Sequence, residues 1–265
     1  MTAQESGLIV ANDSVSDGYF KIRLACADHY KNAIPGQFVT LRQPGQSRPL
    51  LRRPFSIHRI QQVNGSGLNL EILYRVVGGF TGDLSETKPG GLIDILGPLG
   101  HGFSVSRYSR PVVLAAGGIG VAPLMHLADC LKQKGTDSRL INVFLGGRTK
   151  TDILCREEFL GLGARIFTAT EDGTQGRKGF VTDPLLTWLK ENTPAIIYAC
   201  GPHAMLEAIG KIAESKKIAC EVSIETLMAC GLGVCMGCAV SANDAREGYG
   251  HVCKDGPVFD AGVLF

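Results

Sequence analysis

The sequence ETLMACGLGVCMGCAVSANDAREGYGHVC occupies residues 225–253 and carries four cysteines in a short span. They follow the pattern C-x4-C-x2-C-x14-C, at Cys230, Cys235, Cys238 and Cys253. Gly231, Gly233 and Gly237 lie between them and give the backbone the freedom that a tight loop needs. The pattern therefore predicts a loop that wraps closely around one inorganic centre and presents thiolates to it.

The spacing identifies which centre to expect. In plant-type [2Fe–2S] sites, cysteines at C-x4-C-x2-C share one loop and a distant cysteine completes the ligand set. We therefore expect Cys230, Cys235, Cys238 and Cys253 to hold a [2Fe–2S] cluster. Structural zinc is an alternative, but it usually takes two CxxC-like pairs, whereas Cys253 stands alone here. Thiols without a ligand are the third possibility.

The overall composition is that of an ordinary globular protein. The chain has 265 residues, of which 45% are hydrophobic and 20% charged, long enough for more than one domain. A net charge of +2 predicts neither nucleic-acid nor membrane binding, and no apolar stretch reaches the ~20 residues of a membrane span. The first residues, MTAQESGLIV, do not resemble a secretion signal. Nine cysteines without such a signal favour a reducing, cytoplasmic location.

Residues 1–105 have the pattern of a β-domain. Short runs rich in Val, Ile, Leu, Phe and Tyr predict strands at 8–12, 18–25, 37–42, 54–60, 68–76 and 91–96, separated by Gly- and Pro-containing turns. Six short strands without long helices predict a six-stranded antiparallel β-barrel, with one helical turn near residues 81–85.

The pattern changes after Pro111. The apolar run at 112–116 predicts a buried parallel strand, and residues 121–134 have apolar positions at helical spacing. Further strands are expected at 139–145, 165–169, 195–199 and 218–224, and further helices at 153–160, 183–191 and 203–215. This alternation predicts a five-stranded parallel α/β domain. The expected fold is therefore α+β multidomain, with a barrel at 1–105, a nucleotide-binding α/β domain at 106–224 and a small C-terminal [2Fe–2S] domain at 225–265.

Two turns of the α/β region are suited to a nucleotide. The sequence GGIGVAP, residues 117–123, follows a strand and opens a helix, where glycines and a helix N-terminus favour a phosphate. Pro123 replaces the third glycine of the usual dinucleotide fingerprint, so the match is partial. Cys200, Gly201 and Pro202 follow another strand, at the edge of the sheet where ligands bind. Cys200 either faces a nicotinamide there or is a buried thiol.

A third motif lies in the barrel. Arg53, Pro54, Phe55 and Ser56 begin a predicted strand. The planar arginine fork can hold a pyrophosphate, a serine hydroxyl can reach a flavin nitrogen, and Phe55 and Tyr74 can lie against an isoalloxazine face. An arginine at a strand start beside a buried serine is the simpler interpretation of these four residues alone.

Together, RRPFSI, GGIGVAPL, CGPHAML and the tail ETLMACGLGVCMGCAV…HVCKDGPVF resemble one family. Over nearly its whole length the chain is similar to the iron–sulfur electron-transfer subunit of type 1B dihydroorotate dehydrogenase, in the ferredoxin–NADP reductase superfamily. The three shorter motifs occur in many reductases, whereas the cysteine pattern followed by VCKDGPVF is more specific to this subunit.

The resemblance implies the cofactors FAD, NAD and [2Fe–2S] and no catalytic side chain. It implies FAD contacts from Arg53, Pro54, Phe55, Ser56, Leu73, Tyr74, Arg75, Phe80 and Thr81, with Phe80 in place of a usual glycine. It implies NAD contacts from Gly118, Gly120, Pro123, Cys200, Gly201 and Pro202. Arg148 and Lys150 follow a strand and would suit the 2′-phosphate of NADP or be solvated, and NAD is expected because the family uses it.

The resemblance also implies a role in pyrimidine biosynthesis. An FMN-containing catalytic subunit would oxidise dihydroorotate and join this chain in a heterotetramer, with Leu232, Val234 and Met236 among the contacts. Single electrons would enter through the cluster, reach FAD and leave as hydride to NAD⁺. One alternative is a related NAD(P)H-linked reductase subunit of a hydrogenase or a transhydrogenase. The other is a zinc-bearing sensor of the NADH/NAD⁺ ratio that is not an enzyme.

Overall fold

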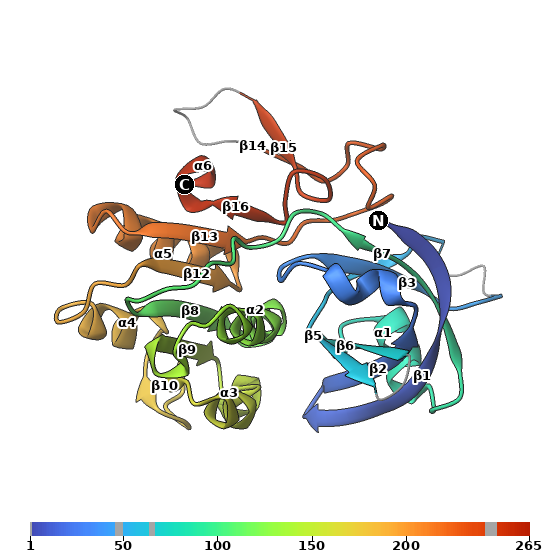
Figure 1. Ribbon diagram of the computed structural model, residues 1–265, viewed down its shortest axis with the longest axis horizontal. Coiled ribbons are helices and arrows are strands. Elements are labelled where there is room, and N and C mark those ends of the chain that lie inside the picture. The colour runs from blue at the N-terminus through green and yellow to red at the C-terminus, as the bar shows by residue number, and fades with distance from the viewer. Residues whose placement is uncertain (1, 46–49, 64–66, 242–247) are drawn as a thin grey trace.

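The structure is a computed structural model that describes residues 2–45, 50–63, 67–241 and 248–265. An antiparallel barrel from the first third of the chain lies beside an α/β sheet from the middle, and the C-terminal segment lies across one end of both (Figure 1). Within the described ranges, no helix is both long and apolar enough to cross a membrane.

The N-terminal part is a seven-stranded antiparallel sheet in the order β4-β3-β7-β1-β2-β6-β5. Its elements are β1 (Ala3–Ser16), β2 (Tyr19–Cys26), the 3₁₀ helix η1 (Asp28–Asn32), β3 (Phe38–Arg42), β4 (Arg53–Ser56), β5 (Arg59–Val63), β6 (Gly67–Arg75), α1 (Gly79–Glu86) and β7 (Leu92–Leu99). The sheet curls around a core in which Ile22, Leu24 and Leu70 are fully buried. The antiparallel barrel is therefore confirmed, with a different number of strands.

The seventh strand arises because the predicted strand at 54–60 is two strands. β4 pairs with β3, whereas β5 pairs with β6. The chain changes partner at two fully buried residues: Ile57 N–H donates to Gln37 O (3.1 Å), and His58 N–H donates to Glu71 O (2.9 Å). One continuous segment thus supplies two consecutive strands with different partners, which the sequence pattern alone cannot reveal. Helix α1 is likewise longer than the single turn expected.

The second sheet has the order β11-β10-β9-β8-β12-β13-β16. All five predicted strands are present and parallel: β8 (Val112–Gly117), β9 (Ile141–Gly147), β10 (Arg165–Thr170), β12 (Ile196–Cys200) and β13 (Ala219–Ser223). Two short edge strands were not predicted. β11 (Arg177–Lys178) is parallel to β10, and β16 (Val258–Asp260) is antiparallel to β13. Segments of two or three residues are too short to show a strand pattern.

Helices cover both faces of this sheet. The apolar side chains of α2 (Val121–Gln133) and α3 (Arg156–Leu162) share one core with Val112 and Leu114 of β8. Those of α4 (Thr182–Trp188) and α5 (His203–Ser215) share another core with Val113. Because alternate residues of β8 enter opposite cores, the strand is apolar throughout, as its sequence predicted. Short 3₁₀ turns complete the domain: η2 (Gly118–Gly120), η3 (Ser138–Leu140) and η4 (Lys150–Asp152).

The C-terminal segment leaves the α/β sheet and returns to it at one point. Ser223, the last residue of β13, pairs with Val258 of β16, and Ile224 N–H donates to Pro257 O (3.0 Å). Between these ends, the described parts of residues 224–257 carry the four cysteines and a hairpin of β14 (Ala239–Ser241) and β15 (Tyr249–His251). Helix α6 (Ala261–Leu264) then packs against α5. We call residues 224–257 the cysteine excursion.

Polar contacts join the barrel to the α/β part. They are Ser16 Oγ to Thr151 O (2.8 Å), Tyr19 OH to Asp152 Oδ1 (2.7 Å), Lys21 Nζ to Glu158 Oε1 (2.7 Å), Arg59 Nε to Asp129 Oδ2 (2.6 Å) and His58 Nδ1 with Ala122 O (2.9 Å). The barrel residues Tyr19 and Leu73 also enter the core formed with α2 and α3. The two sheets are therefore held in one relative position.

Candidate functional site

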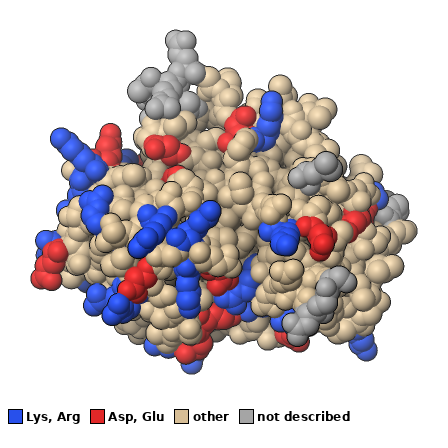
Figure 2. Space-filling model, in the orientation of Figure 1, with Lys and Arg blue, Asp and Glu red and all other residues tan. Residues whose placement is uncertain are grey.

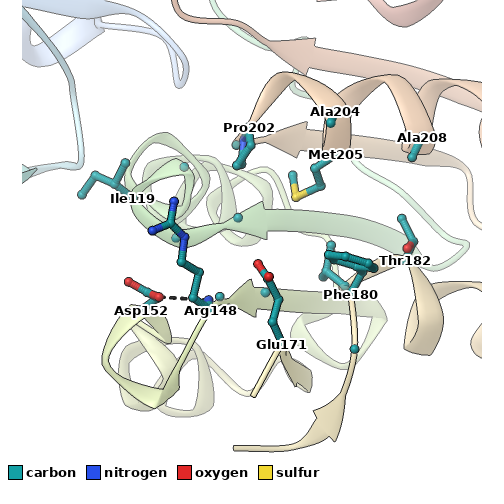
Figure 3. A pocket seen from close by; sticks show the side chains of 18 of the residues that line it. Ile119, Arg148, Asp152, Glu171, Phe180, Thr182, Pro202, Ala204, Met205 and Ala208 are labelled. Carbon is teal, nitrogen blue, oxygen red and sulfur yellow. Dashed lines mark hydrogen bonds between the residues drawn. The ribbon is translucent and has the colours of Figure 1, made fainter. Parts of the chain in front are cut away.

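A pocket of about 540 Å³ opens along the carboxyl ends of the parallel strands (Figure 3). Backbone turns after β8, β9 and β12 line it, and Tyr19 and Arg75 line it from the barrel. Helix α2 begins at the turn after β8, so N–H groups without a partner inside the helix lie beside the pocket. A helix N-terminus next to a glycine turn is a ready site for phosphate, so the pocket suits a dinucleotide.

The turn after β8 requires glycine. A side chain on Gly120 would overlap the carbonyl group of Cys200, so only glycine lets this turn pass so close to β12. Gly118 has a φ of 53°, in the left-handed region that glycine adopts readily. These two glycines were predicted for the nucleotide site, and both line the pocket.

Two further predicted nucleotide residues, Gly201 and Pro202, also line the pocket, but Pro123 and Cys200 do not. Pro123 is buried in the first turn of α2, and Cys200 is 3% exposed at the end of β12. Burial raises the pKa of the Cys200 thiol to about 12. Tight packing of α2 and β12 leaves both side chains beneath the pocket wall. For Cys200 this position agrees with the alternative of a buried thiol, and the NAD contacts of both residues stay predictions.

Several pocket side chains were not predicted, among them Tyr19, Glu171, Phe180, Met205 and Glu225. Glu171 directly follows β10, and Glu225 is two residues beyond the end of β13, so the rule that ligands bind at strand carboxyl ends could have found them. Phe180 follows the unpredicted strand β11, and no sequence signal marks it. Glu225 lines the pocket, and burial of its carboxyl group among the pocket walls raises its pKa.

Tyr19 links the barrel wall of the pocket to the α/β part. Its hydroxyl donates to Asp152 Oδ1 (2.7 Å), and the Arg75 guanidinium lies 5.4 Å from the centre of its ring. Burial, with Asp152, raises the pKa of Tyr19 to about 12. Asp152 Oδ2 also accepts from the N–H groups of Arg148 (2.9 Å) and Thr149 (3.2 Å). The Asp152 carboxylate is therefore occupied in holding the loop after β9.

The three predicted FAD segments converge at Phe55. The ring centre of Phe55 lies 6.1 Å from that of Tyr74 and 6.1 Å from that of Phe80. Arg53, at the start of β4, is only partly buried and donates from Nη1 to Leu51 O (3.1 Å), which leaves other donors of its fork for a ligand. The N-terminus of α1 adjoins Phe80. The arginine fork of this motif and the N-terminus of the helix that Phe55 contacts are both suited to the pyrophosphate of FAD.

The side chain of Tyr74 is not presented to a cofactor. It is 2% exposed, its hydroxyl donates to Asn12 Oδ1 (3.0 Å), and its ring stacks on Phe20. Because β6 turns Tyr74 into the barrel core, its ring is not exposed to a ligand in this structure, and its contact with FAD stays a prediction. Only its backbone remains available.

The other predicted FAD residues have distinct positions. Leu73 faces the core shared with α2, and Arg75 lines the pocket. Thr81 Oγ1 accepts from the N–H groups of Val77 (2.9 Å) and Gly78 (3.1 Å), which fixes the start of α1. Pro54 and Ser56 are both partly buried on β4. The FAD contacts of these residues stay predictions.

The four cysteines of the excursion lie in two pairs. Cys238 Sγ is 3.2 Å from Cys253 Sγ. Cys230 Sγ accepts from the N–H groups of Leu232 (3.3 Å) and Cys235 (3.4 Å). Burial raises the pKa of the Cys230 thiol, but these N–H donors stabilise the thiolate and help to lower the pKa to about 6.

This arrangement fits a [2Fe–2S] cluster, because each of its two irons takes two protein ligands. Gly233 N–H donates to Cys253 Sγ (3.1 Å), so backbone donors reach sulfur in both pairs. Gly231 and Gly233 have φ angles of 70° and 76° and shape the loop as predicted. Over the described ranges, no group of three or more His, Cys, Asp or Glu side chains converges like the ligands of a single metal ion.

The cysteine loop, residues 230–238, packs against the barrel next to the predicted flavin motif at residues 53–56. A side chain on Gly231 would come within 3.2 Å of Thr40 Cγ2 on β3. Thr40 and Phe38 pair in turn with Pro54 and Ser56 of β4. One strand, about 5 Å across, therefore separates the cysteine loop from the strand expected to bind FAD.

The outer surface of the loop is apolar. Leu232, Val234 and Met236 are 50%, 78% and 59% exposed, and Leu227 nearby in sequence is 89% exposed. Elsewhere, Lys and Arg are interspersed with Asp and Glu on the face drawn in Figure 2. Exposed apolar groups close together are typical of a surface that binds another protein.

Comparison with known proteins gives two family matches. Residues 225–264 match the iron–sulfur cluster binding domain of dihydroorotate dehydrogenase B, and residues 114–211 match the oxidoreductase NAD-binding domain. The electron transfer subunit of NAD⁺-dependent dihydroorotate dehydrogenase B from Desulforamulus reducens is 36% identical over 95% of this chain and 94% of its own length. The subunit of the same name from Geobacillus sp. is 37% identical over 100% of this chain and 99% of its own length.

Solved structures agree with this match. A chain of an NADH-dependent reduced ferredoxin–NADP oxidoreductase, studied for flavin-based electron bifurcation, has a TM-score of 0.84 and 29% identity, and the match covers 98% of this chain and 89% of that chain. The ferredoxin reductase in carbazole 1,9a-dioxygenase has a TM-score of 0.66 at 23% identity, covering 82% and 67%, and shares the fold.

Proposed function

The chain belongs to the family of dihydroorotate dehydrogenase B electron transfer subunits, and we propose that it holds [2Fe–2S], FAD and NAD in that spatial order. When bound, the cluster carries single electrons, and the flavin converts pairs of them to the hydride that NAD⁺ accepts. The residues of this chain bind and position these groups. The observation that carries the proposal is that the cysteine loop packs against β3, which pairs directly with β4, the strand of the flavin motif.

Each group has its own binding residues. Cys230, Cys235, Cys238 and Cys253 are the cluster ligands, and the N–H groups of Leu232, Gly233 and Cys235 stabilise their thiolates. Arg53, Ser56 and the N-terminus of α1 hold FAD. The turn at Gly118 and Gly120, with Gly201 and Pro202, holds the dinucleotide. These assignments divide the chain into the domains 1–105, 106–224 and 225–265.

The partner is a catalytic subunit in a complex. We propose that it contains FMN, oxidises dihydroorotate and docks on the apolar loop surface at Leu232, Val234 and Met236. Docking there would bring the partner's electron donor next to the cysteines. A heterotetramer in the cytoplasm is the expected assembly.

Reconstitution tests this function. The chain, purified without oxygen, should contain one FAD and two irons with two acid-labile sulfides. Mixed with an FMN-containing dihydroorotate dehydrogenase subunit, it should reduce NAD⁺ when dihydroorotate is added. A fully loaded chain that forms a complex yet supports no NAD⁺ reduction would contradict the proposal.

A second candidate partner follows from the match to the ferredoxin–NADP oxidoreductase chain over 98% of this chain. In such a complex, the same cofactors would exchange electrons with ferredoxin. NADH-dependent reduction of ferredoxin in the co-purified complex, without dihydroorotate activity, would favour this second function.

A further inference from the structure

Glu225 places a negative charge at one end of the dinucleotide pocket. It lies two residues beyond β13, near the start of the cysteine excursion, and its side chain lines the pocket. Within the described ranges, its carboxyl group makes no hydrogen bond or ion pair. The other described pocket residues that follow β12 are uncharged: Gly201, Pro202, Ala204, Met205 and Ala208. This charge is therefore available to a ligand.

The carboxylate of Glu225 is poorly solvated. Its side chain is accessible from the cavity, but the pocket walls surround the carboxyl group. Burial raises its pKa, and no cation of the described chain acts in the opposite direction. Burial and, after it, the charge of Glu225 also raise the pKa of the Cys200 thiol at the end of β12. Because charges attract more strongly where water is scarce, a cation beside Glu225 would be bound more firmly than one at the open surface.

The flavin motif lies on the same side of the pocket as Glu225. Phe38, which pairs with Ser56 of β4, shares one core with Ile224, and Ile224 directly precedes Glu225. The nicotinamide half of a dinucleotide must reach the flavin, because hydride passes between the two. With the phosphates at the Gly118 turn, the nicotinamide ring is therefore expected on the β12–β13 side, next to Glu225.

The charge of the nicotinamide ring depends on its oxidation state. The ring of NAD⁺ is a cation, whereas the dihydronicotinamide ring of NADH is neutral, and the rest of the two molecules is the same. A negative side chain beside the ring therefore strengthens the binding of NAD⁺ much more than the binding of NADH.

We propose that the Glu225 carboxylate makes the pocket bind NAD⁺ more tightly than NADH. When NAD⁺ accepts a hydride, its ring loses the positive charge and with it the attraction to Glu225. The reduced dinucleotide then leaves more readily than the oxidised one. The inference rests on the proposed function, because it assumes that the pocket binds a dinucleotide with the nicotinamide toward the flavin.

Calorimetric titration of the oxidised, cofactor-loaded chain with three ligands tests this. They are NAD⁺, tetrahydro-NAD, which has a neutral ring that cannot donate hydride, and ADP-ribose, which has no nicotinamide. At about pH 8, where carboxyl groups are ionised, the wild type should bind NAD⁺ at least ~10-fold more tightly than tetrahydro-NAD. Glu225→Gln keeps the shape and removes the charge. It should reduce this ratio at least ~5-fold by weakening NAD⁺ alone, and ADP-ribose should bind as before.

Glu171→Gln is the matched control. Glu171 lines the same pocket, but it follows β10, on the opposite side of the turn after β8. Because NAD⁺ and tetrahydro-NAD differ only in the nicotinamide ring, this variant should leave the ratio of their affinities unchanged. A ratio that falls equally in both variants would show that the effect does not come from the position of Glu225, and would overturn the proposal.

The remaining outcomes separate the inference from the proposed function. An unchanged ratio in Glu225→Gln, or equal weakening of NAD⁺ and tetrahydro-NAD, would overturn the role of the charge while leaving the dinucleotide site intact. Failure of the wild type to bind ADP-ribose would overturn the dinucleotide site itself. Normal flavin content and ADP-ribose affinity show that the variant is folded.

Product inhibition gives a second measurement that needs no partner subunit. When the chain oxidises NADH with ferricyanide as acceptor, NAD⁺ competes for the same pocket. In Glu225→Gln, the inhibition constant for NAD⁺ should rise at least ~5-fold relative to the KM for NADH. Equal changes in the two constants would contradict the proposal.

Discussion

Arg59 of the barrel and Asp129 of α2 form a two-pronged ion pair, with Nε to Oδ2 at 2.6 Å and Nη2 to Oδ1 at 3.2 Å. Both side chains are 19% exposed, so the pair is largely shielded from water. Removing one partner leaves the other charge without compensation in a poorly solvated place. This pair should therefore contribute to holding the two sheets together.

Asp129→Asn should lower the free energy of unfolding by about 1–3 kcal/mol. Urea denaturation of the loaded protein measures it. Asp137→Asn is the control, because Asp137 pairs with Arg139 at the same 2.6 Å with side chains that are 44% and 85% exposed. It should cause no measurable change, since exposed pairs contribute little. Equal effects of the two substitutions would show that Arg59 and Asp129 do not stabilise the contact between the sheets.

Stability should fall in mild acid because of two buried histidines. Burial lowers the pKa of His58 to about 3 and that of His126 to about 4, from an ordinary value of 6.5. Below pH 6.5 the unfolded chain binds protons that the folded chain does not. The free energy of unfolding should therefore decrease between pH 6.5 and 4, by up to ~1.4 kcal/mol per pH unit for each histidine, and these groups should have no effect above pH 7.

Urea denaturation at several pH values checks this. Replacing both His58 and His126 by glutamine should flatten the pH dependence, even though the variant will be less stable at every pH. His203→Gln removes an exposed histidine and should leave the slope as in the wild type. A slope that persists in the double variant would refute the assignment.

The cluster should be separable from the flavin. Cys238→Ser removes a ligand whose sulfur lies 3.2 Å from that of Cys253, so iron and acid-labile sulfide should be lost. FAD content and ferricyanide reduction by NADH should remain, because the residues proposed to bind FAD and the dinucleotide lie outside the loop that carries the cysteines. Cys130→Ser, on α2, is the control and should retain iron. Normal iron content in Cys238→Ser would contradict the ligand assignment.

The closeness of the cysteine loop to β3 should matter for electron transfer. Gly231→Ala adds a Cβ that would lie 3.2 Å from Thr40 Cγ2 and strains a φ of 70°. Gly18→Ala is a matched control, since Gly18 has a φ of 71° and no neighbour within 4 Å of the added carbon. Both should lose about 1 kcal/mol of stability from backbone strain. Only Gly231→Ala should slow flavin reduction by the cluster in stopped-flow absorbance, and equal rates would argue against this contact.

The apolar loop surface should be required for the complex. Leu232→Asp places a charge on a side chain that is 50% exposed beside the cysteines, and it should weaken binding of the catalytic subunit at least ~10-fold. Leu160→Asp on α3, where the leucine is 42% exposed, is the control and should bind normally. Iron content is measured first, so that lost binding is not confused with a lost cluster. Normal binding by iron-loaded Leu232→Asp would place the partner elsewhere.

Much of the architecture could be predicted because its signals are local. The five parallel strands are continuous apolar runs, and the cysteine spacing is a property of one loop. The residues that close the pocket depend instead on tertiary structure. Glu171 and Phe180 come together only when β10 and the short strand β11 lie side by side. The division of residues 54–60 between two strands also depends on partners distant in sequence, Gln37 and Glu71.

The same limit applies to residues whose type suggested a role. Cys200 and Tyr74 carry groups suited to cofactor chemistry, but the structure buries both. Burial is decided by which face of a strand meets the core, and a one-residue shift in register reverses it. Motif matching locates such residues along the chain without revealing the direction of their side chains.

The pairing of Ser223 with Val258 makes the cysteine excursion an insertion within a β-hairpin, with both ends fixed at one point of the sheet. A short turn in place of residues 226–255 would still connect β13 to β16. We therefore expect the shortened protein to keep the residues proposed to bind flavin and nucleotide, and the same junction to accept other redox-active loops of suitable length. Interchange of electron-carrying modules at such a junction would let one reductase framework serve many different partners.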